Sequence, residues 1–66
     1  MSIVKVIEVI SEGDSVEAAI KSAVAEAAKT LEHIKQVNVD HVEALVDKQE
    51  VVKFRVHCKV SFLVKH

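Results

Sequence analysis

Basic and imidazole side chains alternate with apolar ones along the C-terminal part of the chain. The basic positions are Lys53, Arg55, His57 and Lys59. Residues two apart in a β-strand share one face of the sheet, so the sequence predicts a cationic stripe. Two interpretations fit this stripe. It can receive an anion such as a phosphorylated cofactor, or the carboxylates of Asp40, Glu43 and neighbouring chains can neutralise it.

A second polar group lies upstream, where Asp40, His41 and Glu43 stand close together in the sequence. Carboxylate oxygens suit hard cations, so one hypothesis is a cation site that copies of these residues complete at a symmetry axis. The histidines show no spacing typical of a metal site, and we expect surface or pairing roles for them. They are His33, His41, His57 and His66. Motif spacing therefore predicts no metal site.

Cys58 is the single cysteine, so no internal disulfide can form. It alternates with the basic stripe and should point into the core as a small hydrophobic residue. Its neighbour His57 should point to the opposite face, where it is poorly placed to activate a nucleophile. The chain also lacks a Gly-rich phosphate loop and a paired acid and base. We therefore expect a protein that is not an enzyme.

The period-2 pattern over residues 51–64 predicts the longest and most central strand of a sheet. A first strand is expected at residues 3–10, which are rich in β-branched side chains, with a break at residues 11–13. Asp14 is a good N-cap for a helix over residues 15–30. Apolar residues of that helix recur every three or four positions along one stripe. They are Val16, Ala19, Ile20, Ala23, Val24, Ala27 and Leu31.

A second strand is expected at residues 36–47, where the apolar phase slips by one residue near the middle. A β-bulge at Asp40 and His41 would produce such a slip. A three-residue loop at residues 48–50 then joins this strand to the last one. The expected cross-strand pairs are Val46 with Val52, Ala44 with Phe54, Val42 with Val56, Val39 with Cys58 and Val37 with Val60.

The order of the elements determines the sheet. A helical crossover makes the first two strands parallel, and the hairpin makes the third antiparallel to the second. Placing the third strand between the others gives an antiparallel sheet of order 1-3-2. The predicted fold class is therefore α+β, with one helix on a three-stranded sheet in a single domain over residues 1–66. Glu43 lies opposite Arg55 in this register, so we expect a cross-strand ion pair.

A chain of 66 residues usually needs a source of stability beyond its own core. This one has two Phe, no Trp or Tyr, and no disulfide or zinc motif, so we expect it to form an oligomer. A net charge of −1 argues against nucleic acid as a partner. No apolar stretch is long enough to span a membrane, and no signal peptide is recognisable. We expect a soluble cytoplasmic protein.

Several segments resemble the dodecin family in their order and spacing. They are KVIEVI, the capped VEAAI with AAKTL near the helix end, a V-x-V strand and FRVHCKVSF. The resemblance covers nearly the whole chain. It implies a small strand-helix-strand-strand protein that assembles as a hollow homododecamer and binds pairs of flavins between subunits. FMN or riboflavin is the cofactor that it implies.

Two positions depart from the pattern of typical family members. Gln36 stands where flavin-binding members carry a tryptophan that stacks on the isoalloxazine, and Arg55 stands where they carry a glutamine that hydrogen-bonds the flavin. The resemblance thus implies Gln36 and Arg55 as cofactor-binding residues, but Gln36 offers no π-face for stacking. Our first hypothesis is a homo-oligomer that binds or stores a small molecule. The second is a shell without flavin, either structural or binding a cation or an anion.

Overall fold

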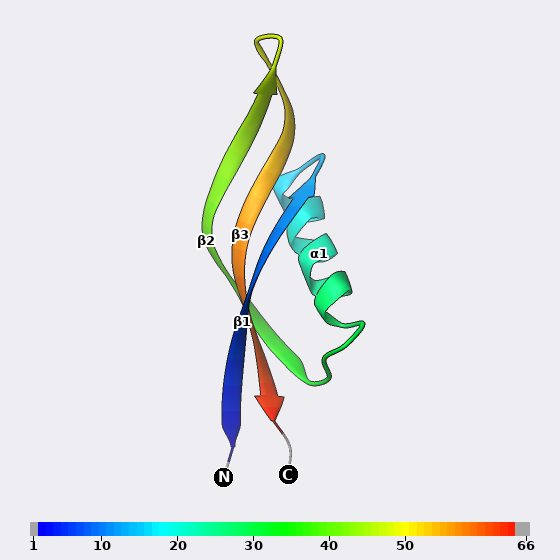
Figure 1. Ribbon diagram of the computed structural model, residues 1–66, viewed down its shortest axis with the longest axis vertical. Helices are drawn as coiled ribbons and strands as arrows, with labels where there is room; N and C mark the ends of the chain where they lie inside the picture. Colours follow the sequence, from blue (N-terminus) through cyan, green and yellow to red (C-terminus); the bar gives the residue numbers. More distant parts are fainter. Residues whose placement is uncertain (1, 65–66) are drawn as a thin grey trace.

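The computed structural model describes residues 2–64, and these form one helix and three strands. The elements are β1 (Ile3–Gly13), α1 (Val16–Ala27), β2 (Ile34–Asp47) and β3 (Glu50–Val64). The strands make one antiparallel sheet of order β1-β3-β2 (Figure 1). The predicted α+β fold, the sheet order and the central position of the longest strand are confirmed.

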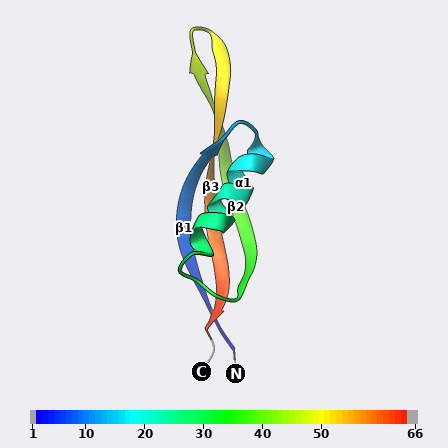
Figure 2. The same cartoon turned by 90° about the vertical axis from the view of Figure 1, so that its right-hand side faces the viewer.

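The sheet is a long twisted ribbon, and α1 covers one of its faces (Figures 1 and 2). The molecule extends over 51 × 20 × 13 Å. The β2–β3 hairpin continues beyond the helix as a projecting arm, while both ends of the described chain lie at the opposite end (Figure 1). Within residues 2–64 no second layer covers the other face of the sheet.

The core lies between α1 and β3 and consists of small side chains. Its buried members are Ala19, Ala23, Ala27, Val56, Cys58 and Val60. Alanine at every fourth helical position leaves room for the helix to approach the sheet closely. The predicted helical stripe is confirmed within the helix, where Val16 and Ile20 pack against this core, but Leu31 lies beyond the end of the helix. Val56 and Val60 are the largest fully buried side chains, so the core of one chain is small.

Gly13 marks a close approach of β1 to the helix. A Cβ atom at this position would lie 2.7 Å from the backbone nitrogen and 3.0 Å from the Cα atom of Ala19. The position therefore excludes a side chain. The predicted strand end at Ile10 is wrong, because β1 stays paired with β3 from Ser11 to Gly13. The polar residues after Ile10 continue the ladder because backbone pairing does not require apolar side chains.

The helix starts and ends differently from the prediction. Ser15, and not Asp14, is the N-cap: its Oγ accepts a hydrogen bond from the Ala18 amide at 3.0 Å. Both residue types cap helices well. Because β1 extends to Gly13, Asp14 lies in the connection between the strand and the helix. The helix ends at Ala27 rather than at residue 30. The following residues form a turn, in which the Leu31 amide donates to the Ala27 carbonyl at 2.9 Å.

The predicted β-bulge is present in β2. The register shifts between Val39 and His41, which leaves Asp40 as the extra residue. The predicted pairs on both sides of the bulge are confirmed. They are Ala44 with Phe54, Val42 with Val56, Val39 with Cys58 and Val37 with Val60. A second shift, between Ile34 and Gln36, is a feature that the sequence pattern did not predict.

The turn of the hairpin is shorter than expected. Asp47 pairs with Glu50, so the loop contains two residues rather than three. These residues, Lys48 and Gln49, have φ angles of 52° and 68°. Positive φ at both positions is typical of the two-residue turns that match strand twist. Val46 consequently pairs with Val51, and the predicted pairing with Val52 is wrong.

Candidate functional site

The sheet face opposite α1 carries charged and polar side chains from all three strands. We call it the open face and define it by residues of all three strands that share this side in the observed register. They are Glu8, Ile10 and Glu12 of β1, Gln36, His41 and Glu43 of β2, and Arg55, His57, Lys59 and Ser61 of β3. The even-numbered residues of β3 between them face the helix and are buried. The predicted cationic stripe therefore lies on a face that this chain leaves uncovered.

Arg55 is held mainly by β1. Its Nη2 and Nε atoms donate to Glu12 Oε2 at 2.7 and 3.0 Å. The predicted cross-strand ion pair with Glu43 is confirmed, although it is longer, with 4.0 Å between Glu43 Oε1 and Arg55 Nη1. The hydrogen bond with Glu12 and its negative charge raise the pKa of the guanidinium. Arg55 is thus a fixed cation whose charge is already compensated within the chain.

His57 completes a group with two residues of β2. Its Nε2 atom lies 2.5 Å from Glu43 Oε1, and its ring stacks on that of His41 with centroids 3.8 Å apart. The hydrogen bond with His57 lowers the pKa of the Glu43 carboxyl below its ordinary value, so Glu43 is ionised at neutral pH. The potential ligand atoms of His41, Glu43 and His57 all lie within 4.8 Å of one another.

The carboxylate of Asp40 contacts residues other than His41 and Glu43, with which the sequence hypothesis grouped it. Its carboxylate lies 3.5 Å from Lys59 Nζ and accepts a hydrogen bond of 2.7 Å from the Asn38 amide. The structure therefore joins His41 and Glu43 with His57, while Asp40 neutralises Lys59. Cys58 is only 2% exposed, as predicted. Burial, and secondarily the charge of Asp40, raises the pKa of its thiol.

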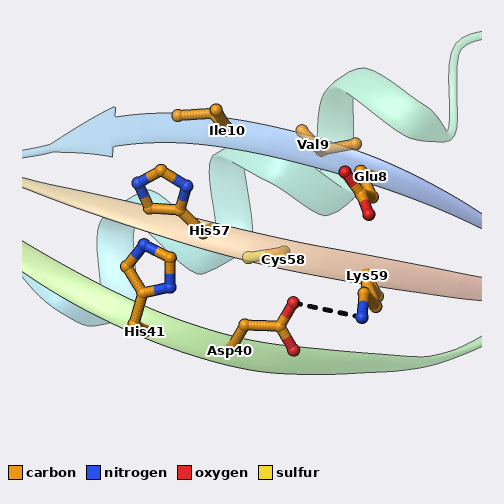
Figure 3. A pocket seen from close by; sticks show the side chains of 8 residues that line it. All are labelled: Glu8, Val9, Ile10, Asp40, His41, His57, Cys58 and Lys59. Atoms are coloured by element: carbon orange, nitrogen blue, oxygen red, sulfur yellow. Dashed lines mark ion pairs between the residues drawn. The ribbon is translucent and has the colours of Figure 1, made fainter.

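A shallow pocket of about 170 Å³ opens on this face beside the two stacked imidazoles (Figure 3). It is lined by Glu8, Val9, Ile10, Asp40, His41, His57, Cys58 and Lys59. Pockets that hold a cofactor-sized ligand usually measure about 300–1,000 Å³. A larger hollow of about 400 Å³ lies between the loop after α1 and the end of β3, and neither Gln36 nor Arg55 lines it. The open face of one chain is thus too shallow to enclose a flavin.

Gln36 and Arg55 share the open face but do not meet. Gln36 lies opposite Ser61, which is six residues from Arg55 along β3. At about 3.3 Å per residue this separation is about 20 Å. Gln36 is exposed, and Arg55 is half-buried between its carboxylate partners. One chain therefore does not bring the two expected contacts to a common ligand.

The remaining histidines stay apart from this group. His33 is exposed in the loop before β2 and lies 3.8 Å from Glu32. His66 lies outside the described residues. The role of His57 beside His41 was missed because the two are sixteen positions apart in the chain. The strand register already indicated that the two histidines meet, since a bulge at Asp40 places His41 opposite His57.

Comparisons with known proteins assign the family. The dodecin family model matches residues 3–65. A variant of the Thermus thermophilus dodecin superposes with a TM-score of 0.93 at 27% identity, covering 100% of both chains. The Streptomyces coelicolor dodecin has a TM-score of 0.91 at 26% identity, covering 98% of this chain and 94% of its own. No match was found among curated proteins.

The chain belongs to the dodecin family, whose known members bind flavins. The fold likeness extends to the dodecin of Streptomyces davaonensis, with a TM-score of 0.91 at 20% identity over 98% of this chain and 97% of that one. The family model and the superpositions confirm the resemblance inferred from the sequence segments.

The described residues contain no helix that is both long and apolar enough to cross a membrane.

Proposed function

We propose that this chain forms a homo-oligomer, a dodecamer by analogy with its family, and binds or stores a small molecule between subunits. Flavin, as FMN or riboflavin, is the candidate ligand. One observation carries the proposal: Gln36 and Arg55 lie on the same uncovered face but about 20 Å apart. A single flavin that contacts both residue types must therefore lie between two copies of the chain.

The distribution of apolar residues supports assembly. Val4, Val6 and Ile10 of β1 project on the side of the open face and are 57%, 53% and 62% exposed. Strands β2 and β3 expose further large apolar residues. They are Val42, Val46, Val51 and Val52. Exposed apolar surface of this extent, beside a core of small residues, is typical of a protomer that buries it against other copies.

The chemistry of the two candidate contacts favours polar recognition of the ligand. The Gln36 amide can donate and accept hydrogen bonds, and the Arg55 guanidinium has donors beyond the two that Glu12 occupies. Both suit the carbonyl and nitrogen atoms at the polar edge of a flavin ring. The only described thiol is buried, so it is unsuited to nucleophilic attack. We therefore propose a binding role without catalysis, in the cytoplasm, where a free cysteine stays reduced.

A second candidate function is a shell that does not bind flavin. The observation that favours it is the ion pair of Arg55 with Glu12, because this pair occupies the side chain that would contact the ligand. The absence of a π-face at Gln36 has the same effect. The open face would then serve assembly alone or receive a smaller ion.

A flavin titration of the purified oligomer separates the two functions. We expect wild type to quench flavin fluorescence and Gln36→Trp to bind more tightly, by about 5- to 150-fold if the new ring stacks with about 1–3 kcal/mol. Lys21→Trp, on the exposed face of the helix, is the matched control and should behave as wild type. Failure of both wild type and Gln36→Trp to quench would reject flavin and leave the shell function.

A further inference from the structure

We propose that His41, Glu43 and His57 form a binding site for a divalent transition metal of the zinc class. The two imidazoles and one carboxylate supply three ligands, and their donor atoms lie within 4.8 Å of one another. Two nitrogens and one carboxylate oxygen are a recurrent ligand set for such metals, and they leave a further coordination position open. None of the three ligands is a proposed flavin contact, although Glu43 Oε1 lies 4.0 Å from Arg55 Nη1.

The backbone brings the three side chains together. His41 and Glu43 are two residues apart on β2 and therefore project from the same face. His57 lies on the adjacent strand, directly opposite His41. The bulge residue Asp40 sets this arrangement, because without the extra residue His41 would point toward the helix. Figure 3 shows both imidazoles standing side by side on the open face.

The observed distances suit a metal after small side-chain rotations. His57 Nε2 and Glu43 Oε1 now share a hydrogen bond of 2.5 Å. Two ligand atoms bound tetrahedrally to Zn²⁺ at about 2.0–2.1 Å would lie about 3.3 Å apart. Insertion of the metal would therefore replace this hydrogen bond and separate the pair by less than about 1 Å. The stacked ring of His41 must turn its donor nitrogen toward the same point.

The charges around the group favour a cation. Glu43 supplies a carboxylate to the group, and Glu8 of the neighbouring strand lines the pocket beside the two imidazoles. The nearby cation Arg55 is compensated by two hydrogen bonds to Glu12. Lys59 is likewise paired with Asp40. Arg55 and Lys59, the positive charges close to the site, thus have other carboxylates as their nearer partners, and the nearest partner of Glu43 is the potential ligand His57.

The ligand types distinguish zinc-class metals from calcium. Ca²⁺ requires six to eight oxygen ligands, and this group supplies one carboxylate with two imidazoles. Asp40, which a calcium site at this place would recruit, is engaged by Lys59. His41 and Glu43 are exposed, so water or a ligand from another copy can reach the open position. The geometry thus selects against a hard cation.

Metal titrations of the assembled, untagged, flavin-free protein test the proposal. Co²⁺ reports imidazole coordination by its visible absorption, and Zn²⁺ displaces it. We expect saturable binding at one Co²⁺ per chain, displacement by Zn²⁺ and no displacement by an equal concentration of Ca²⁺. His41→Gln and His57→Asn should each weaken binding at least about tenfold. Circular dichroism and gel filtration show whether each variant keeps its fold and assembly.

Two control variants separate this site from adventitious binding. His33→Asn removes an exposed histidine outside the group, and Asn tolerates the positive φ of 61° at that position. Glu26→Gln removes an exposed helical carboxylate. Both should bind Co²⁺ as wild type does. No Co²⁺ binding by wild type, or equal binding by wild type and a folded His41→Gln variant, would overturn the proposal without bearing on the flavin titration.

Discussion

Arg55 and Glu12 are joined across β3 and β1 by two hydrogen bonds, at 2.7 and 3.0 Å. Typical family members are expected to have glutamine at the position of Arg55. This chain carries a cation where the resemblance implies a neutral side chain, and the ion pair keeps that charge compensated. Glu12 lies in the part of β1 that extends beyond the expected strand end. The longer strand thus supplies the partner of Arg55.

Removing this partner should change the ligand preference of the open face. In Glu12→Gln the Arg55 guanidinium loses its nearer carboxylate partner, keeps only Glu43 at 4.0 Å, and becomes more available to a phosphate. We expect the affinity for FMN to rise relative to riboflavin by up to about fivefold, the range of a partly exposed ion pair. Parallel fluorescence titrations with the two flavins measure the ratio. Glu17→Gln, which breaks the exposed helical pair with Lys21, should leave it unchanged.

The same preference should disappear in the double variant Glu12→Gln/Arg55→Gln, since the guanidinium that would contact the phosphate is then absent. An FMN to riboflavin ratio that stays raised in this double variant would show that Arg55 does not contact the phosphate. The comparison therefore tests whether Arg55 contacts the phosphate of FMN in addition to the edge of the flavin ring.

Apolar residues of β1 on the side of the open face should hold the oligomer together. Val6 is 53% exposed in one chain, and a charge there would have to be buried in the assembled state. We expect Val6→Asp to shift the protein from oligomer toward monomer in gel filtration at micromolar concentration. Lys21→Asp introduces the same side chain on the exposed helix and should leave the elution volume of the oligomer unaltered.

Gly13 should be required for the contact between β1 and α1. A Cβ atom would approach the Ala19 backbone nitrogen to 2.7 Å, and backbone cannot move aside as a flexible side chain can. Gly13→Ala should lower the free energy of unfolding by about 1–3 kcal/mol. Urea unfolding at a fixed protein concentration measures the change. Ser22→Ala, on the exposed helix face, should change it by less than about 0.5 kcal/mol, and equal effects of both would refute the close-contact argument.

Much of the fold could be predicted because its signals are local. Alternation along β3 gave the central strand, and the phase slip near Asp40 gave the bulge. The turn was harder to predict, because Lys48 and Gln49 adopt positive φ without the Gly or Asn that usually marks such turns. Two good capping residues in succession likewise left the first residue of the helix ambiguous.

The site depends on relationships that the sequence pattern does not display. The contact of His57 with Glu43 and His41 requires the register and the side-chain orientations of two strands. The contact of Arg55 with Glu12 requires β1 to extend past its apolar segment. Family resemblance pointed to Gln36 and Arg55, but it did not indicate that Glu12 hydrogen-bonds the Arg55 guanidinium.

Cys58 should make stability depend on pH on the alkaline side. Burial raises the pKa of its thiol, so the folded protein retains a proton that the unfolded chain releases. The resulting stabilisation is complete below the pKa of the unfolded thiol, about 8.5, and declines as the pH rises above it. Wild type and Cys58→Ala are compared at pH 8 and pH 10, two chosen conditions on either side of about 8.5. We expect the free energy of unfolding of wild type to fall relative to that of the variant between these two conditions. A difference that stays constant or grows over this range would contradict the assigned direction.

Sedimentation velocity of wild type with FMN tests the central claim most directly, because it reports assembly and ligand binding in one experiment. Protein is followed by its peptide absorbance and flavin by its visible absorbance. We predict that flavin sediments together with a protein boundary whose mass is much larger than the 7.3 kDa of one chain, as expected for a ligand held between subunits. A boundary at the mass of one chain, or an oligomer boundary from which flavin is absent, would contradict the proposed function.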